Sequence, residues 1–500
     1  MKDELLLGID FGTSTNYVTK YDFAKKDAVA VANMGDYGGS NIFENTIYIE
    51  SGSNVILGKL ANKKGVSSPM NFFRDIKRHI SSDNWSQKIP HLDNQIFTAQ
   101  DIATLIFKEI KTKVEKIENR PIDGVVLTVP YSYGDQYRRR LRESAQNAGL
   151  SVINIIEEPI AAAVSFGLFD NNSTTKDEKI LVFDFGGGTL DITVFNFSKK
   201  NQSHAEIEVL NTSGVEQLGG KDIDEIMISK FKSIIGVEYD DILNDVELKK
   251  YQEVLNKTAT EQKENLSFDD ETEVYENFDL NRTTKELEID LTVEEFNQWL
   301  KSNNIIGKIE DALDQVLWDI GEDGLEPEDI DKIILAGGSS IIPIINETIA
   351  NYFNKMPIVQ SNLGELVGRG AGIVAGIAFD DSLNYNIIKK VSKNVGIAQG
   401  NKFISILNKN TNYGVESDFF EIKINNLTDT NIKRSFYEGD TSTIENCEYI
   451  GHIEFDTVNV GSSKIFITLS KDINDGRIVY KLYDDKKTTL ESDCIENKKG

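Results

Sequence analysis

The sequence predicts a duplicated α/β domain followed by an all-β sandwich domain. A glycine-centred motif occurs twice, at 8–16 and 184–191, and each copy stands between two short apolar runs of strand type. Strand-type and helix-type segments alternate as far as residue 380, which is typical of α/β domains. From 391 to 485 the chain changes to short strands separated by turns rich in Asn and Gly, which favours an all-β module.

The first half of the α/β part supplies strands and helices in turn. Apolar residues at helical spacing predict a helix that includes 99–107, and the apolar run at 124–130 predicts a buried strand. A helix predicted from 135 to 148 stops at Gly149, a typical C-cap, and a second begins with Pro159 in its first turn.

The second half repeats this alternation. Residues 180–210 are predicted strands around the second motif, and 221–320 are mostly helical with one β-like insert near 272–291. A strand at 333–336 precedes a helix that Pro343 opens. We therefore expect the α/β domain to span 1–380, a linker 381–391, the sandwich 392–486 and a polar tail 487–500.

The composition excludes several classes of protein. A net charge of −27 argues against nucleic acid as a partner, because phosphate backbones need a basic surface. Two cysteines and four scattered histidines do not make a disulfide framework or a His/Cys metal centre. The N-terminus lacks a signal-peptide pattern, and no apolar run approaches the ~20 residues of a membrane span. We expect a cytoplasmic protein that binds neither nucleic acid nor membrane.

Both copies of the glycine motif have the chemistry of a phosphate site. Glycines let backbone N–H groups approach an anion, and the hydroxyls of Thr and Ser add donors. Asp10 and Asp184 end the first strand of each copy, where a carboxylate can hold a hydrated Mg²⁺. One copy alone would more often be an ordinary hairpin. Two copies with the same core predict a clamp on a polyphosphate.

Eight segments, in this order and at these spacings, resemble the seventy-kilodalton heat-shock chaperone family (DnaK-like). They are GIDFGTSTN (8–16), IKR (76–78), VLTVP (126–130), EEPIAAA (157–163), DFGGGTLDI (184–192), LGGKDID (218–224), EQKENLS (261–267) and ILAGGSS (334–340). The resemblance covers 1–380 clearly and 391–485 more loosely.

The resemblance implies a fold and a function. It implies two ribonuclease-H-like (actin-like) lobes around a nucleotide cleft, then a linker and a β-sandwich that grips peptides. The implied activity is that of an ATP-dependent chaperone that hydrolyses ATP and binds extended apolar peptide segments. The implied cofactors are ATP or ADP with Mg²⁺ and K⁺, and the implied partners are unfolded peptides, J-domain proteins and nucleotide-exchange co-chaperones. The family's helical lid does not follow the sandwich within these 500 residues, so a lidless form is expected.

The resemblance also assigns roles to residues of the cleft. It implies that the catalytic residues are Lys77, Glu158, Asp184, Thr189 and Asp10. It implies that Mg²⁺ is held through water by Asp10, Asp184 and Asp191. The residues that it places around the phosphates, ribose and base are Gly12, Thr13, Ser14, Thr15, Gly186, Gly187, Gly188, Gly219, Gly220, Lys263, Ser267, Gly337, Gly338, Ser339 and Ile341.

The adenosine side departs from the family pattern. The arginine that the family usually has near the base is Ile341 here, and the acid of the ribose-binding helix is Thr260. Glu264 and Gly364 replace two further common residues. The resemblance therefore supports hydrolysis more strongly than selective binding of adenine.

Two residues match the elements that relay the nucleotide state in the family. They are Pro130, at the end of the apolar run 124–130, and Arg138 on the next helix. We expect the neighbouring arginines to form a solvated basic face; these are Arg139, Arg140 and Arg142. The family's linker is a leucine run followed by Asp, whereas this one carries Lys389 and Lys390. We therefore expect weak coupling between the domains.

Five residues of the sandwich match the peptide groove. They are Val395, Ile397, Gly400, Phe403 and Ile432. Most alternating apolar residues in such a module are core, so each assignment competes with a packing role. Two other functions stay open: a nucleotide-switched scaffold that holds one dedicated partner, which the altered linker and absent lid favour, and a small-molecule kinase, which the β module disfavours.

Overall fold

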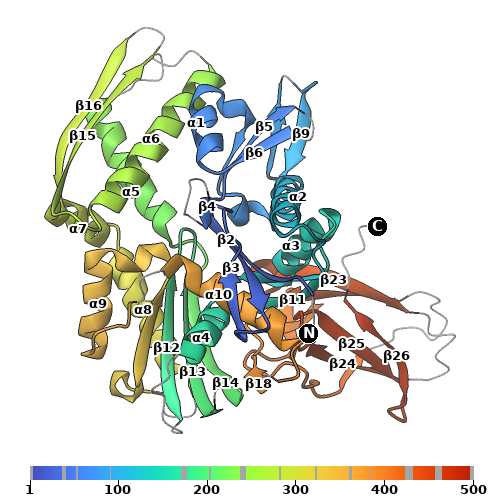
Figure 1. Ribbon diagram of the computed structural model, residues 1–500. Helices are drawn as coiled ribbons and strands as arrows, with labels where there is room; N and C mark the ends of the chain where they lie inside the picture. Colours follow the sequence, from blue (N-terminus) through green and yellow to red (C-terminus); the bar gives the residue numbers. More distant parts are fainter. Residues whose placement is uncertain are drawn as a thin grey trace.

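The chain folds into two α/β lobes and a β-sandwich packed beside the first lobe (Figure 1). The computed structural model describes residues 4–35, 41–51, 54–90, 92–169, 177–201, 204–236, 244–280, 283–320, 324–359, 363–382, 384–422, 432–455 and 464–495. No helix in these ranges is long and apolar enough to cross a membrane.

The first lobe is built on a sheet in the order β11–β10–β1–β2–β3, with β4 also paired to β2. Its first strand has a parallel neighbour, β10, on one side and an antiparallel neighbour, β2, on the other. The strands are β1 (Leu6–Phe11), β2 (Thr15–Asp22), β3 (Asp27–Ala30), β4 (Ile42–Glu44), β10 (Gly124–Val129) and β11 (Val152–Glu157).

The second lobe repeats this arrangement. Its sheet has the order β17–β12–β13–β14–β18, in which β12 pairs parallel to β17 and antiparallel to β13. The strands are β12 (Glu178–Phe185), β13 (Leu190–Asn201), β14 (His204–Val215), β17 (Lys332–Ala336) and β18 (Asn384–Ile388). The duplication expected from the two glycine motifs is therefore present in the strand pairing.

Helices and smaller sheets complete the two lobes. The helices are α1 (Lys59–Ser67), α2 (Ala99–Glu118), α3 (Asp135–Asn147), α4 (Glu158–Phe169), α5 (Gly220–Ile235), α6 (Asp245–Asn265), α7 (Val293–Ser302), α8 (Ile305–Trp318), α9 (Pro343–Phe353) and α10 (Leu363–Ile377). Short 3₁₀ turns cover Pro69–Asn71, Ile76–His79, Pro327–Asp329, Gly338–Ile341 and Ile444–Asn446. The remaining strands are β5 (Ile47–Ser51), β6 (Asn54–Leu57), β7 (Phe72–Phe73), β8 (Ser86–Ile89), β9 (Gln95–Thr98), β15 (Glu271–Asp279) and β16 (Thr284–Thr292).

The two lobes share one apolar core around α4 and α10. This core joins residues of the first sheet, such as Val126, to residues of the second, such as Val182. The helices cross so closely that a Cβ on Gly370 would overlap the backbone of Ala161. Small residues at this crossing bring the ends of both sheets, and the glycine turns that follow them, to one cleft.

The sandwich consists of two four-stranded sheets. One has the order β20–β19–β22–β23 and the other β21–β24–β25–β26. The strands are β19 (Val395–Gln399), β20 (Lys402–Leu407), β21 (Phe420–Ile422), β22 (Ile432–Glu438), β23 (Glu448–Phe455), β24 (Ile465–Lys471), β25 (Ile478–Tyr483) and β26 (Thr489–Cys494). The expected polar tail from 487 is thus corrected: 489–494 form an edge strand antiparallel to β25.

The linker is also different from the expectation. Within the predicted linker 381–391, residues Asn384–Ile388 form β18, which pairs parallel to β14 and extends the second sheet. Three of these five residues are apolar, and backbone hydrogen bonding does not depend on the side chain. The segment is therefore a structural part of the second lobe in this conformation.

Candidate functional site

The two glycine turns face each other across the cleft. A Cβ on Gly187 would overlap the side chain of Ser14, and a Cβ on Gly188 would overlap that of Thr13. Only glycine allows this approach, so the backbone N–H groups of one turn lie opposite the hydroxyls of the other. The Asn45 amide also donates to the Gly12 carbonyl at 2.6 Å and fixes the first turn. The predicted clamp residues are thus brought together.

Lys77 and Glu158 form a buried ion pair beside these turns. The distance from Lys77 Nζ to Glu158 Oε1 is 2.6 Å, and the Lys77 side chain is 3% exposed. Lys77 lies on the 3₁₀ turn Ile76–His79, which follows Asp75 in a left-handed conformation (φ 56°). Burial opposes its charge, but Glu158 and Asp10 raise the pKa of the Lys77 ammonium above its ordinary value. Lys77 is therefore a fixed cation inside the cleft.

Three aspartates share this site with Glu158. Burial and then the Glu158 charge raise the pKa of Asp10 to about 7 and that of Asp191 to about 6. Burial and then the Glu158, Asp191 and Asp10 charges raise the pKa of Asp184 well above its ordinary value. Carboxylates that repel one another in a buried site favour the arrival of a cation.

The aspartates suit a cation held through water. Among the described residues, no three histidine, cysteine or carboxylate side chains are grouped closely enough to bind a metal ion directly. Asp191 Oδ2 is buried and has no hydrogen-bond partner within the described part of the chain, while Thr128 donates to Asp10 Oδ1 at 2.7 Å. A free acceptor oxygen beside other carboxylates at strand ends fits hydrated Mg²⁺, which keeps several of its waters in proteins.

Two further glycine turns close over the second turn. The N–H groups of Gly220 and Lys221 donate to the carbonyls of Gly186 and Gly187, at 3.0 and 2.9 Å. Ser339 Oγ donates to the Gly186 carbonyl at 2.9 Å. Gly219 contacts Gly187 and Gly188 so closely that no side chain would fit, and Gly337 (φ 74°) contacts Asp184. The predicted residues of this side therefore form one assembly.

Lys263 and Ser267 lie next to it on α6. Lys263 Nζ donates to the Gly220 carbonyl at 2.9 Å and to Asp224 Oδ1 at 2.6 Å, and Ser267 Oγ donates to the Lys263 carbonyl. Asp224 was not singled out from the sequence, although it ends the quoted segment 218–224. It also accepts a hydrogen bond from Thr260 at 2.9 Å, so this threonine takes part in the network despite departing from the family acid.

Arg78 is a second residue that the sequence analysis missed. It follows Lys77, and its Nη2 donates to the Gly188 carbonyl at 2.8 Å and pairs with Asp222 of the second lobe. It therefore connects the two lobes at the second glycine turn. The only signal for it in the sequence was its place in the segment 76–78.

The remaining predicted residue of the base side, Ile341, is half-buried and packs against the apolar core of the second lobe. Gly338, three residues earlier, has open space where its Cβ would be. An aliphatic side chain that is held by the core offers no cation to stack on an aromatic base.

Arg138 and Glu157 form a buried ion pair at 2.9 Å where the sandwich meets the first lobe. Glu157 also accepts a hydrogen bond from Tyr413 of the sandwich, at 3.2 Å. Lys389 is 5% exposed, and its ammonium lies 5.0 Å from the ring centre of Tyr413. Burial opposes the charged form of Glu157, but the charge of Lys389, followed by that of Arg138, holds the pKa of the Glu157 carboxyl below its ordinary value. Pro130, the predicted relay residue, is buried at the start of this region.

One expectation about this region is corrected. Arg140 and Arg142 are each only 9% exposed: Arg140 pairs with Asp83 of the first lobe, and Arg142 with Asp475 of the sandwich at 3.4 Å. They are contact residues rather than a solvated face, and Figure 1 shows the sandwich next to α3. Lys389 donates to the Asn474 carbonyl and Lys390 to the Leu210 carbonyl, each at 3.3 Å, and the expected weak coupling between the domains stays a prediction.

The groove assignment is corrected in part. Val395 and Ile432 belong to the buried core of the sandwich, with exposed fractions of 0% and 5%. Ile397 is half-buried, Phe403 is 9% exposed, and Gly400 (φ 63°) occupies the tip of the hairpin between β19 and β20. Alternating apolar residues serve both a core and a groove, so the sequence pattern alone did not separate them.

Comparison with protein families gives one result that spans almost the whole chain. The family model described as Hsp70 protein matches residues 6–499, from the first strand of the first lobe to beyond the last strand of the sandwich. With this coverage, the chain belongs to the Hsp70 family of ATP-dependent chaperones.

Proposed function

We propose that the two lobes form a ribonuclease-H-like (actin-like) ATPase, and that the sandwich binds extended apolar peptide segments under its control. The observation that carries the ATPase half is the facing pair of glycine turns, where Gly187 contacts Ser14 and Gly188 contacts Thr13. A site of this shape offers backbone donors and hydroxyls to a chain of phosphates from two sides.

In this proposal the turns hold ATP with its γ-phosphate next to Lys77. The hydroxyls of Thr13, Ser14 and Thr15 bind from the first lobe, and Thr189 binds from the second. Lys77, fixed by Glu158 at 2.6 Å, neutralises the charge that grows on the γ-phosphoryl group in the transition state. Glu158 accepts a hydrogen bond from the attacking water and orients it. Asp10, Asp184 and Asp191 would hold Mg²⁺ through water, and the ion would neutralise further phosphate charge.

The adenosine would lie beyond the second turn. Lys263 and Ser267 of α6 would face the ribose, and Gly337, Gly338 and Ser339 would flank the base. The support for this side is the assembly of Gly219, Gly220 and Ser339 against the second glycine turn. J-domain proteins and nucleotide-exchange co-chaperones are the partners that family membership suggests.

The ATPase proposal is tested by comparing three proteins in single-turnover ATP hydrolysis over a range of Mg²⁺ concentrations. The wild type should hydrolyse ATP in a Mg²⁺-dependent way. Asp184→Asn should lose about 10²–10³-fold in rate, the usual cost of removing one electrostatic contact to a transition state. Asp269→Asn, the same change at an exposed position, serves as the control and should behave as the wild type. Equal rates and equal Mg²⁺ dependence in all three would refute the site.

The scaffold hypothesis stays as a second candidate, because two of the five expected groove residues are buried in the sandwich core. Binding to a peptide array separates the two functions. Broad binding to extended apolar segments supports the chaperone, whereas one sharp sequence preference supports a scaffold for a dedicated partner.

A further inference from the structure

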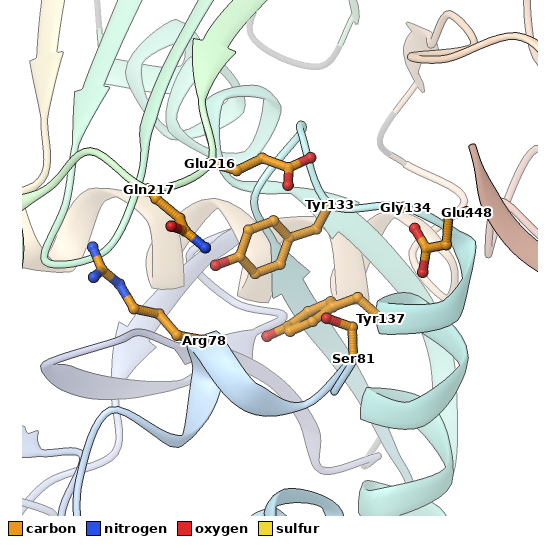
Figure 2. A pocket seen from close by; sticks show the side chains of 8 residues that line it. All are labelled: Arg78, Ser81, Tyr133, Gly134, Tyr137, Glu216, Gln217 and Glu448. Carbon is orange, nitrogen blue, oxygen red and sulfur yellow. The ribbon is translucent and has the colours of Figure 1, made fainter. Parts of the chain in front are cut away.

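A cavity of about 110 Å³ lies where both lobes and the sandwich meet (Figure 2). Tyr133 and Tyr137, at the start of α3, line its inner part. Its outer part is lined by Ser81, Glu216 and Gln217, which are exposed, and the sandwich contributes Glu448. The cavity therefore leads from a buried end to solvent.

The buried end adjoins the catalytic residues. Arg78, which lines the cavity, donates to the Gly188 carbonyl in the second glycine turn. Burial raises the pKa of Tyr133 to about 12, and the charges of Lys77, Asp191 and Glu158 also act on this hydroxyl. Arg78 therefore contacts both the cavity and the second glycine turn.

Donors without partners point into this space. The hydroxyl of Tyr137 and the Nε of Arg78 are buried and have no hydrogen-bond partner among the described residues. Figure 2 shows the hydroxyls of Tyr133 and Tyr137 both directed toward the side where Arg78 lies. Leaving a buried donor unpaired is costly, so these groups fit a ligand with several acceptor oxygens.

Size and charge indicate which ligand. The cavity is several times larger than the roughly 10–15 Å³ that one water needs, so it has room for a tetrahedral oxyanion. A guanidinium and phenol hydroxyls at the inner end attract such an anion. Glu216 and Glu448, which line the outer part of the cavity, do not attract an anion. An anion that reaches them is therefore not retained.

We propose that orthophosphate, the product of the proposed hydrolysis, leaves through this cavity and is held on its way by Arg78 and the Tyr137 hydroxyl. The inference rests on the proposed ATPase function. It separates the exit of phosphate from the exit of ADP. No bond is made or broken in this step.

The test blocks the outer end with a large side chain. Ser81→Trp and, from the opposite lobe, Gln217→Trp fill the cavity mouth, while Ser86→Trp adds the same bulk on exposed strand β8 as a control. Single-turnover hydrolysis is followed by acid quench, and phosphate release by a fluorescent phosphate-binding sensor. Both blocking variants should release phosphate about tenfold more slowly at an unchanged hydrolysis rate, because product release is a separate step.

A second measurement uses inorganic phosphate added to the ADP-loaded protein. Ser81→Trp should slow association and dissociation by the same factor and leave Kd unchanged, since a barrier acts in both directions. Tyr137→Phe should instead raise Kd about fivefold, the value of one hydrogen bond. Unchanged release in both blocking variants, or equal slowing in Ser86→Trp, would overturn the exit route. If the wild type does not hydrolyse ATP at all, the quench measurement shows this by itself, and the proposed function falls together with the inference.

Discussion

Arg138 Nη1 donates to Glu157 Oε1 at 2.9 Å, and both side chains are almost completely buried beneath the sandwich. The same carboxylate accepts from Tyr413 of the sandwich and lies close to Lys389 of the linker. Glu157 therefore connects α3, β11, the linker and the sandwich. It also directly precedes Glu158, the partner of Lys77. The contacts of the sandwich and the proposed catalytic site therefore meet in two adjacent residues.

We predict that Glu157→Gln releases the sandwich from the lobes. The change keeps the shape of the side chain but leaves Arg138 and Lys389 buried without their common anion, and breaking such a pair typically costs about 3–5 kcal/mol. Small-angle X-ray scattering should report a larger radius of gyration, and the amides of β18 should exchange faster with solvent. Glu445→Gln, at an exposed position of the sandwich, is the matched control. A compact Glu157→Gln protein with a protected β18 would show that other contacts hold the domains together.

We also predict that docking strengthens as the pH falls from 7 to about 4.5. Burial and the Glu438 charge raise the pKa of Asp135 to about 6 and that of Glu448 to about 7, above ordinary values of 3.8 and 4.5. The Glu438 charge acts on Asp135 across the interface, whereas Glu448 lies on the same sheet as Glu438 and is influenced across the interface by Asp135 and Glu216. A group whose pKa is raised on docking binds more protons in the docked state, so docking is favoured below the raised pKa and weakens as the pH rises through it.

The neighbouring groups do not reverse this sign in the stated window. The pKa of Glu438 is lowered beside Lys471, so its own contribution changes only below its ordinary value of 4.5. The pKa values of Lys393 and Arg138 are raised, so both stay charged throughout, and Glu216 adds to the repulsion at Glu448. Scattering from pH 5 to 8 should show compaction at the acid end, and Glu448→Gln should flatten the profile. Expansion toward pH 5 would contradict the prediction.

A third prediction concerns the base. Ile341 packs against the core of the second lobe and cannot place a cation on an aromatic ring, so discrimination between ATP and GTP should be weak. Ile341→Arg should tighten binding of ATP by about 1 kcal/mol, the usual size of a cation–π contact. Calorimetry with both nucleotides is the measurement, with Ile341→Leu as the control for packing. A strong preference for ATP in the unmodified protein would mean that other groups read the base.

The parts of this structure that the sequence predicted are those with local signals. The two glycine turns stand out because glycine, hydroxyl and carboxylate residues adjoin one another in the chain, and their positions at strand ends follow from periodicity. Strand β26 lacks such a signal, because most of its side chains are exposed and polar. The sequence therefore predicted Thr489–Cys494 as part of a polar tail.

The sequence pattern did not predict contacts between residues that are far apart in the chain. Glu157 and Tyr413 are 256 positions apart, and nothing near either residue indicates the other. The sequence predicted that Lys389 would weaken docking, because its neighbours Tyr413 and Glu157 come from elements far away in the chain. The sequence predicted Val395 and Ile432 as groove residues, whereas they lie in the core of the sandwich. A core and a groove both require apolar side chains, so the pattern does not distinguish them. Lys77 itself was identified only through family resemblance.

The measurement that tests the central claim most directly is single-turnover ATP hydrolysis by Lys77→Ala, together with nucleotide binding by the same protein. Lys77 is 3% exposed and paired with Glu158 in the cleft, whereas Lys88, the control for Lys→Ala, is exposed on β8. Because Lys77 acts on charge that grows in the transition state, its loss should raise the barrier by about 3–4 kcal/mol and leave ATP binding largely intact. A tenfold change in rate corresponds to about 1.4 kcal/mol, which is less than half of that barrier change. Hydrolysis by Lys77→Ala within about tenfold of the wild-type rate would therefore contradict the account.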